Sequence, residues 1–169
     1  MFETIMDLEV TSTPAETFDH LARGFFEHHR LWDPSVTAMT KLSDGPVGPG
    51  TRGVEGRRFG PWAITSQFEV SEFEPVRRFG FRTTSGPMSE AADMTIEGRP
   101  GGSSVRVHLR LSATAPMLRL LEPVMHPLFA RNARRNGARM VAALNAAAGL
   151  ATAPAAVGSS RSPDTVPHR

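Results

Sequence analysis

Apolar and polar residues alternate along the first segment of the chain. Phe2, Met6 and Val10 fall on one face of an extended backbone, whereas Glu3 and Asp7 fall on the other. This period of two is typical of a half-buried β-strand, because successive side chains of a strand point to opposite sides. The chain therefore opens with a strand.

Two short helices are predicted directly after this strand. Thr13 is a suitable N-cap, Pro14 suits the first helical position, and Glu16 completes a capping box, so a helix begins at Pro14. A second helix is expected over residues 25–31. It ends before Trp32-Asp33-Pro34, because a proline disfavours helical geometry in the residue before it.

Turn signals divide residues 35–113 into about six strands at hairpin spacing. These signals are Asp44-Gly45-Pro46, Gly60-Pro61, Glu74-Pro75, Gly86-Pro87 and Arg99-Pro100-Gly101-Gly102. The clearest strand covers residues 105–111, where aliphatic residues alternate with Arg106, His108 and Arg110. We expect the aliphatic residues to face a packed core and these three polar residues to face solvent.

Residues 116–148 carry the longest helical pattern, since apolar residues recur at intervals of three and four. Pro123 and Pro127 remove backbone donors from this pattern. We therefore expect a short helix to about Glu122 and the main helix from about Val124.

Beyond Gly149 the composition is rich in Ala, Pro and Ser and shows no period. Such a segment has little apolar surface to bury and is typical of disorder. The sequence thus predicts one domain over residues 1–148 and a disordered tail over residues 149–169.

The composition excludes several kinds of functional site. The chain has no Cys, which excludes disulfides, thiolate metal sites and cysteine nucleophiles. Lys41 is the only lysine, yet the net charge is only +2, too even a balance to indicate nucleic-acid binding. With no targeting signal and no apolar run long enough to span a membrane, we expect a cytoplasmic protein.

No cofactor or metal site is expected. Adjacent residues such as His28 and His29 diverge on a helix and have no third ligand at a suitable spacing; His20 and His126 also lack such partners. The chain contains no Gly-rich phosphate-binding motif either. The predicted chemistry therefore depends on carboxylates, arginines and apolar surface.

The order of elements, a strand, two short helices, about six further strands and a long helix, indicates an α+β fold. A twisted sheet of this width must curl around a single long helix. The space between them is then either filled by Phe and Met side chains or left as a cavity.

Several motifs in this order resemble the START-related SRPBCC superfamily, in particular its polyketide cyclase/dehydrase and lipid-transport branch. The resemblance covers residues 1 to about 148 and rests on the order of its motifs. They are Thr-Pro-Ala-Glu-Thr-Phe, His-Arg-Leu-Trp-Asp-Pro-Ser-Val, Gly-Pro-Gly-Thr-Arg, Phe-Glu-Val-Ser-Glu-Phe-Glu-Pro and Gly-Gly-Ser-Ser-Val-Arg-Val. The resemblance implies a helix-grip fold. In this fold a curved antiparallel sheet of about seven strands wraps around a long C-terminal helix, and a ligand cavity lies between them.

Aromatic and flexible side chains on the inner face are the candidate ligand contacts. Asn132 on the long helix and two tryptophans at corners of the fold join them, although Trp32 also suits a buried turn and Asn132 a bond to the sheet. The predicted ligand contacts are Trp32, Trp62, Phe68, Phe79, Phe81, Met94, Leu109, Met125, Phe129 and Asn132.

Glu90 is the one candidate catalytic carboxylate. It is in register with Ala92, Met94 and Ile96 and would point inward, where desolvation raises a carboxyl pKa. We nevertheless expect its position near a strand end to leave it in water. The pattern does not show whether Arg57 and Arg82 point toward the inner or the outer face of the sheet.

Three functions remain open from sequence. The leading one is binding of a small hydrophobic ligand, such as a lipid or polyketide, by a monomer or homodimer. The resemblance also implies an aromatase/cyclase acting on a poly-β-keto chain, but the chain has no Tyr, so no scheme that uses a phenol carries over. The third is docking of an acidic partner, such as an acyl carrier protein or an anionic membrane surface, on Arg131, Arg134, Arg135 and Arg139.

Overall fold

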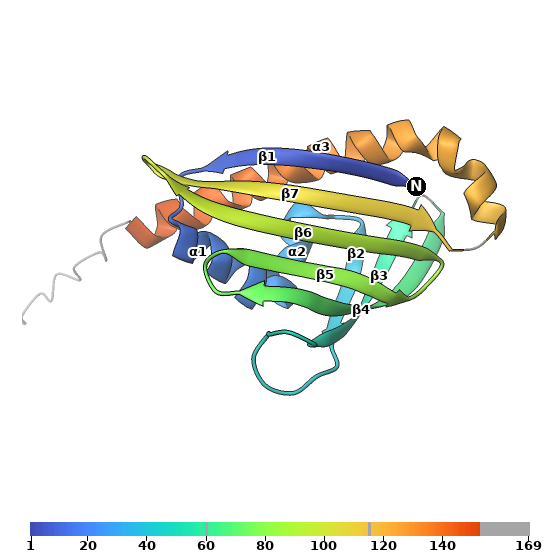
Figure 1. Cartoon of the computed structure of the whole chain (residues 1–169), viewed down its shortest axis with the longest axis horizontal. Helices are drawn as coiled ribbons and strands as arrows, with labels where there is room; N and C mark the ends of the chain where they lie inside the picture. Colours follow the sequence, from blue (N-terminus) through green and yellow to red (C-terminus); the bar gives the residue numbers. More distant parts are fainter. Residues whose placement is uncertain (60, 115, 153–169) are drawn as a thin grey trace, which may run out of the picture.

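The strands in the described part of the chain form one curved antiparallel sheet (Figure 1). This computed structural model describes residues 1–59, 61–114 and 116–152. The strands are β1 (Phe2–Val10), β2 (Val36–Lys41), β3 (Arg52–Phe59), β4 (Trp62–Glu74), β5 (Arg78–Ser85), β6 (Met88–Arg99) and β7 (Gly102–Ala113). Their spatial order is β1-β7-β6-β5-β4-β3-β2, which confirms the predicted α+β helix-grip fold.

The register of the first and last strands fixes which side chains face inward. Met6 pairs with Val107 and Leu8 with Val105, so apolar residues meet apolar residues on the inner face. On the outer face Asp7 pairs with Arg106, as the alternation of both segments predicts.

Irregular pairings bend the sheet. The register shifts between Val36 and Ala38 in β2 and at two places in β4, next to Phe68 and next to Val70. An extra residue in one strand of a pair increases the local twist and bends the strand. Figure 1 shows the resulting curve, with the sheet wrapped around the long helix behind it.

The predicted short helices lie between β1 and β2. They are α1 (Pro14–Phe18), a π-helical turn (Asp19–Arg23) and α2 (Phe25–Trp32). Thr13 and Glu16 form the expected capping box, in which the Thr13 backbone N–H donates to Glu16 Oε2 at 2.8 Å. The helix therefore begins where the sequence indicates.

The long helix α3 (Pro116–Thr152) is continuous, so the predicted break between Glu122 and Val124 is wrong. Figure 1 instead shows α3 bent in its N-terminal part. A helix can accommodate a proline by bending when neighbouring turns keep their hydrogen bonds. The helix also passes the expected domain boundary at residue 149, while residues 153–169 of the predicted tail lie outside the described residues.

Aromatic rings fill one end of the space between sheet and helices. Phe25 of α2 lies at the centre, with its ring centroid 5.8 Å from Phe68, 4.9 Å from Phe79 and 5.0 Å from Phe81. All four residues are buried in the main core cluster. Because α2 inserts Phe25 here, the space between α2 and this end of the sheet is filled by packed aromatic side chains.

Candidate functional site

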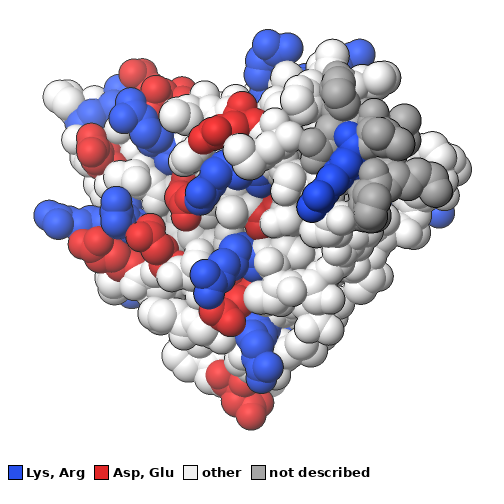
Figure 2. All heavy atoms as spheres, turned by 45° about the vertical axis from the view of Figure 1, so that its right-hand side comes forward, with Lys and Arg blue, Asp and Glu red and all other residues white. Residues whose placement is uncertain are grey.

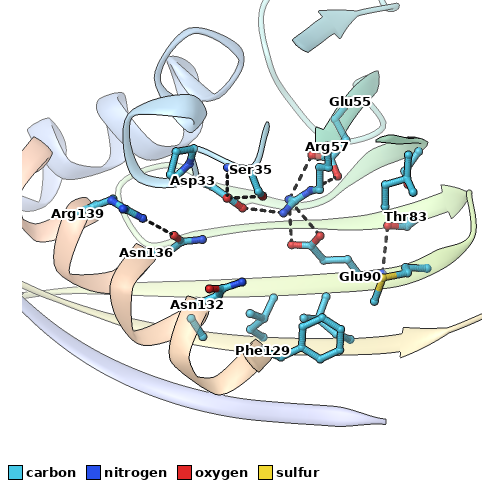
Figure 3. A pocket seen from close by; sticks show the side chains of 17 residues that line it. Asp33, Ser35, Glu55, Arg57, Thr83, Glu90, Phe129, Asn132, Asn136 and Arg139 are labelled. Carbon is cyan, nitrogen blue, oxygen red and sulfur yellow. Dashed lines mark hydrogen bonds and ion pairs between the residues drawn. The ribbon is translucent and has the colours of Figure 1, made fainter. Parts of the chain in front are cut away.

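A cavity of about 150 Å³ lies beyond the aromatic core, between α3 and the inner face of the sheet. Its solvent-facing edge includes Pro34 and Arg139, which are exposed. Apolar side chains form one part of its wall and polar side chains the rest (Figure 3). The apolar part consists of Ile64, Met88, Leu109, Leu111, Phe129 and Ala133.

One guanidinium and three carboxylates form the polar wall. Arg57 Nη1 donates to Asp33 Oδ2 at 2.6 Å, and Arg57 Nε donates to Glu55 Oε1 at 2.7 Å. Arg57 Nη2 lies 3.1 Å from Glu90 Oε2 and also donates to Glu55 Oε2 at 3.3 Å. Only 9% of the Arg57 side chain and 14% of the Glu90 side chain are exposed.

Strand β3 turns both of its charged cluster residues inward. Gly53, Glu55 and Arg57 share the inner face, and an added Cβ at Gly53 would lie 2.4 Å from Cζ of Phe68. The close approach of Phe68 thus requires a glycine at this inward position. The adjacent turn brings Asp33 to the same wall, where its Oδ1 accepts hydrogen bonds from the backbone and hydroxyl of Ser35.

The electrostatics of this wall are unusual because carboxylates outnumber the arginine. Burial raises the pKa of Glu90, Arg57 lowers it, and Glu55 and Asp33 raise it again, with a net value of about 7. Burial also raises the pKa of Asp33, but Arg57 and Ser35 outweigh it and hold that pKa below its usual value. The carboxylates likewise hold the pKa of Arg57 above its usual value despite its burial. Glu90 is therefore the group that exchanges a proton near neutral pH.

We expect the free energy of unfolding to fall as the pH rises from about 4.5 to about 7, because Glu90 holds its proton longer in the folded state than in the unfolded state. The folded protein binds more protons in this window, so its stability is lost on deprotonation. The contribution amounts to about 3 kcal/mol. Urea denaturation across this window measures it.

The matched variant for this titration is Glu90→Gln, which keeps the shape of the side chain without a titrating group. Its stability should stay flat where the wild type declines. An equal decline in both proteins would show that Glu90 is ionised throughout and would contradict the assigned proton.

Polar residues of α3 face the charged wall from across the cavity (Figure 3). Arg139 Nη1 donates to Asn136 Oδ1 at 3.3 Å, and Asn132 lies one turn earlier on the same wall. Because a guanidinium has no acceptor, the oxygen of the Asn136 amide must face Arg139 and its NH₂ group must face elsewhere. The α3 side thus offers hydrogen-bond donors.

Of the predicted ligand contacts and the candidate catalytic carboxylate, four lie on the cavity wall: Leu109, Phe129, Asn132 and Glu90. Met125 is half-buried and lies off this wall. The other candidates are core or surface residues. Phe68, Phe79, Phe81, Met94 and Trp32 pack in the core cluster, whereas Trp62 is 72% exposed. Ligand contact at these outlying residues stays a prediction that the geometry does not favour.

One further expectation is corrected, and one orientation that the sequence leaves open is now defined. Glu90 was expected in water near its strand end, but its side chain is largely buried, and its backbone N–H donates to Thr83 Oγ1 at 3.1 Å. Arg82, whose facing was open, points outward and pairs with Glu69 at 3.4 Å. The sequence does not reveal Glu55 and Asp33 as charged wall residues, because the apolar neighbour Val54 places Glu55 on the outer face and Asp33 fits a turn.

The histidines in the described ranges lie in packed or surface positions. Among the described residues no group of three or more His, Asp or Glu side chains is placed to hold a metal ion. The rings of His20 and His28 stack with centroids 4.0 Å apart, and burial lowers the pKa of His20 to about 4. Burial also lowers the pKa of His29, behind Asp33, to about 3. The rings of His20 and His29 are thus neutral near pH 7.

The outer face of the sheet carries mixed charge. Figure 2 shows blue and red side chains interspersed rather than separated into patches. Arg106 pairs with Asp7 at 2.7 Å, and His108 Nε2 lies 2.6 Å from Glu3 Oε1. These residues face away from the cavity, as predicted. Arg131, Arg134, Arg135 and Arg139 on α3 are exposed, and docking of a partner on them stays a prediction.

The family model described as "Polyketide cyclase / dehydrase and lipid transport" matches residues 1–145. The chain belongs to this family. Members of one family share a fold more reliably than an activity, so the role of the cavity still has to be argued from its own residues. No curated protein matches the chain in sequence.

Several solved structures share the fold. The protein TTHA0849 from Thermus thermophilus has a TM-score of 0.67 at 14% identity, covering 89% of this chain and 99% of its own. The di-domain ARO/CYC StfQ from the steffimycin biosynthetic pathway has a TM-score of 0.66 at 11% identity, covering 87% of this chain and 51% of its own. Ginseng major latex-like protein 151 from Panax ginseng has a TM-score of 0.55 at 11% identity, covering 82% of this chain and 97% of its own.

No helix in the described part of the chain has the length and apolar character needed to cross a membrane.

Proposed function

We propose that this protein binds a small, ring-sized hydrophobic molecule in the cavity between α3 and the sheet. The observation that carries the proposal is a cavity of about 150 Å³ that is lined by both apolar side chains and a buried polar cluster. An apolar protein cavity of about this volume holds one benzene ring. Burial of the ligand's apolar surface supplies the driving force, while the polar wall fixes its orientation.

The buried cluster supports a ligand role rather than a purely structural one. Three carboxylates around Arg57 are costly to desolvate, and apolar residues of similar volume often stabilise a core better than buried ion pairs do. Groups with strongly perturbed pKa values, such as Glu90, concentrate at functional sites.

Filling the cavity should abolish binding. Ala133 is buried on the cavity wall, so Ala133→Leu replaces a methyl by an isobutyl group inside the cavity. We expect the affinity for ethylbenzene, measured by isothermal titration calorimetry, to fall by at least about tenfold, a loss of about 1.4 kcal/mol. Thermal stability should stay close to that of the wild type, because the cavity has room for the added atoms.

The control is Ala138→Leu, which makes the same change on the exposed side of the same helix. It should bind ethylbenzene like the wild type. If ethylbenzene and other one-ring compounds fail to bind the wild type, or if Ala133→Leu binds them unchanged, the cavity is not the binding site.

An acid–base enzyme of the cyclase/dehydrase type is the second candidate. It is favoured by the convergence of Glu90 and Arg57 on the cavity, since such chemistry needs a proton-exchanging group beside a charge-stabilising one. The cavity has room for one ring rather than an extended poly-β-keto chain. A substrate for this reaction would therefore be small, or would reach the cavity with only one end while an acyl carrier protein held the other.

A further inference from the structure

The three carboxylates of the polar wall do not share Arg57 equally. Glu55 accepts from both Nε and Nη2, at 2.7 and 3.3 Å, and Asp33 accepts from Nη1 at 2.6 Å. Glu90 accepts only from Arg57 Nη2, which lies 3.1 Å from one carboxylate oxygen and 3.4 Å from the other. Glu55 also accepts from that nitrogen. Glu90 is thus the carboxyl that Arg57 holds least.

Among the described residues, Arg57 is the cation that pairs with Glu90. Glu55 and Arg57 face it from β3 and Asp33 from the turn after α2, while Thr83 of β5 accepts a hydrogen bond from the Glu90 backbone N–H. From α3, Arg139 lines the same cavity but donates to Asn136. On β6 and β7, Asp93 and Arg110 pair with each other on the outer face. One guanidinium cannot balance three buried carboxylates, so one carboxyl keeps its proton.

We propose that Glu55 is the positioning residue that keeps Glu90 out of a full ion pair with Arg57, so that the Glu90 carboxyl donates a hydrogen bond to an uncharged acceptor on the ligand, such as a ketone oxygen. This inference rests on the proposed binding function and specifies the ligand's polar group. Carboxylate ligands are disfavoured at this wall, because they would add a third negative charge beside Arg57 while Glu90 holds its proton.

Two closely related one-ring probes test the inference. Acetophenone has a carbonyl group where ethylbenzene has a methylene group, so it adds an acceptor oxygen at a small cost in volume. Near pH 5.5 the wild type should bind acetophenone about 3- to 10-fold more tightly than ethylbenzene, the usual net value of one hydrogen bond. This preference should disappear above pH 8, with a midpoint at about 7 where Glu90 loses its proton.

Glu55→Gln should move that midpoint. The substitution removes the carboxylate that holds Arg57 Nε, so Arg57 can pair fully with Glu90. The preference for acetophenone should then disappear at a pH about 1 to 3 units lower than in the wild type, the usual effect of an unshared opposite charge. Glu90→Gln retains an N–H donor and should keep the preference at every pH.

Glu72→Gln is the matched control, because it also removes a carboxylate paired with an arginine, Arg78, but on the exposed face. It should leave the midpoint unchanged. An unchanged midpoint in Glu55→Gln, or equal binding of the two probes by the wild type at low pH, would overturn the role of Glu55 while ethylbenzene binding still supported the cavity. If neither probe binds, the proposed function itself fails.

Discussion

Replacing Arg57 with methionine should lower the free energy of unfolding by about 3 to 5 kcal/mol near pH 8. The substitution leaves Asp33, Glu55 and Glu90 buried without a counterion, and removing one partner of a buried ion pair costs more than the pair itself contributes. Denaturation in urea, with the midpoint and slope fitted separately, measures the loss.

The pH dependence distinguishes this effect from simple loss of packing. Without Arg57 the buried carboxyls have pKa values above those of the unfolded chain, so acidification toward pH 5 should restore part of the lost stability. Arg106→Met is the control, because Arg106 pairs with Asp7 on the exposed outer face, where an ion pair contributes little. A deficit that stays constant with pH would contradict the charged cluster.

The second large effect is expected for Phe81→Ala, at about 3 to 5 kcal/mol of stability. Phe81 is 3% exposed, and its ring lies 5.0 Å from Phe25 and 5.9 Å from Phe68. Truncation leaves a hole in the aromatic core that neighbouring rings cannot fill without leaving their rotamers. Thermal unfolding monitored by circular dichroism measures the loss.

Phe129→Ala provides the comparison, because Phe129 lies on the cavity wall. It should weaken ethylbenzene binding directly by removing ligand contacts. Phe81→Ala, in conditions where it is fully folded, should leave the affinity near the wild-type value. If the two variants exchanged these effects, the boundary between core and cavity would lie elsewhere.

The fold could be predicted because its elements depend on short-range rules. Period-two alternation identified β1 and β7, and the proline and glycine turns delimited the other strands. The predicted break in α3 is wrong. The proline rule counts the backbone N–H donors lost at Pro123 and Pro127, but it does not count the hydrogen bonds that neighbouring turns keep.

The site could be predicted only in part. Phe68 and Leu109 both face inward. Alternation cannot show that Phe25 of α2 fills the space beside Phe68, whereas the space beside Leu109 stays open as the cavity. Strand β3 was harder still, since the rule that apolar residues face inward places Val54 inside and Glu55 outside. The structure does the reverse, because its inner face at this point is a charged wall.

Methyl NMR of the wild type during titration with acetophenone tests the central claim most directly. Two sets of methyl groups report separately on the cavity and on the packed core. The cavity set is Ile64, Met88, Leu109 and Leu111, and the core set is Val70, Met94 and Ile96. We predict saturable shifts in the cavity set and small changes in the core set. Shifts confined to the core set, or an absence of saturable shifts in both, would contradict a ligand site between α3 and the sheet.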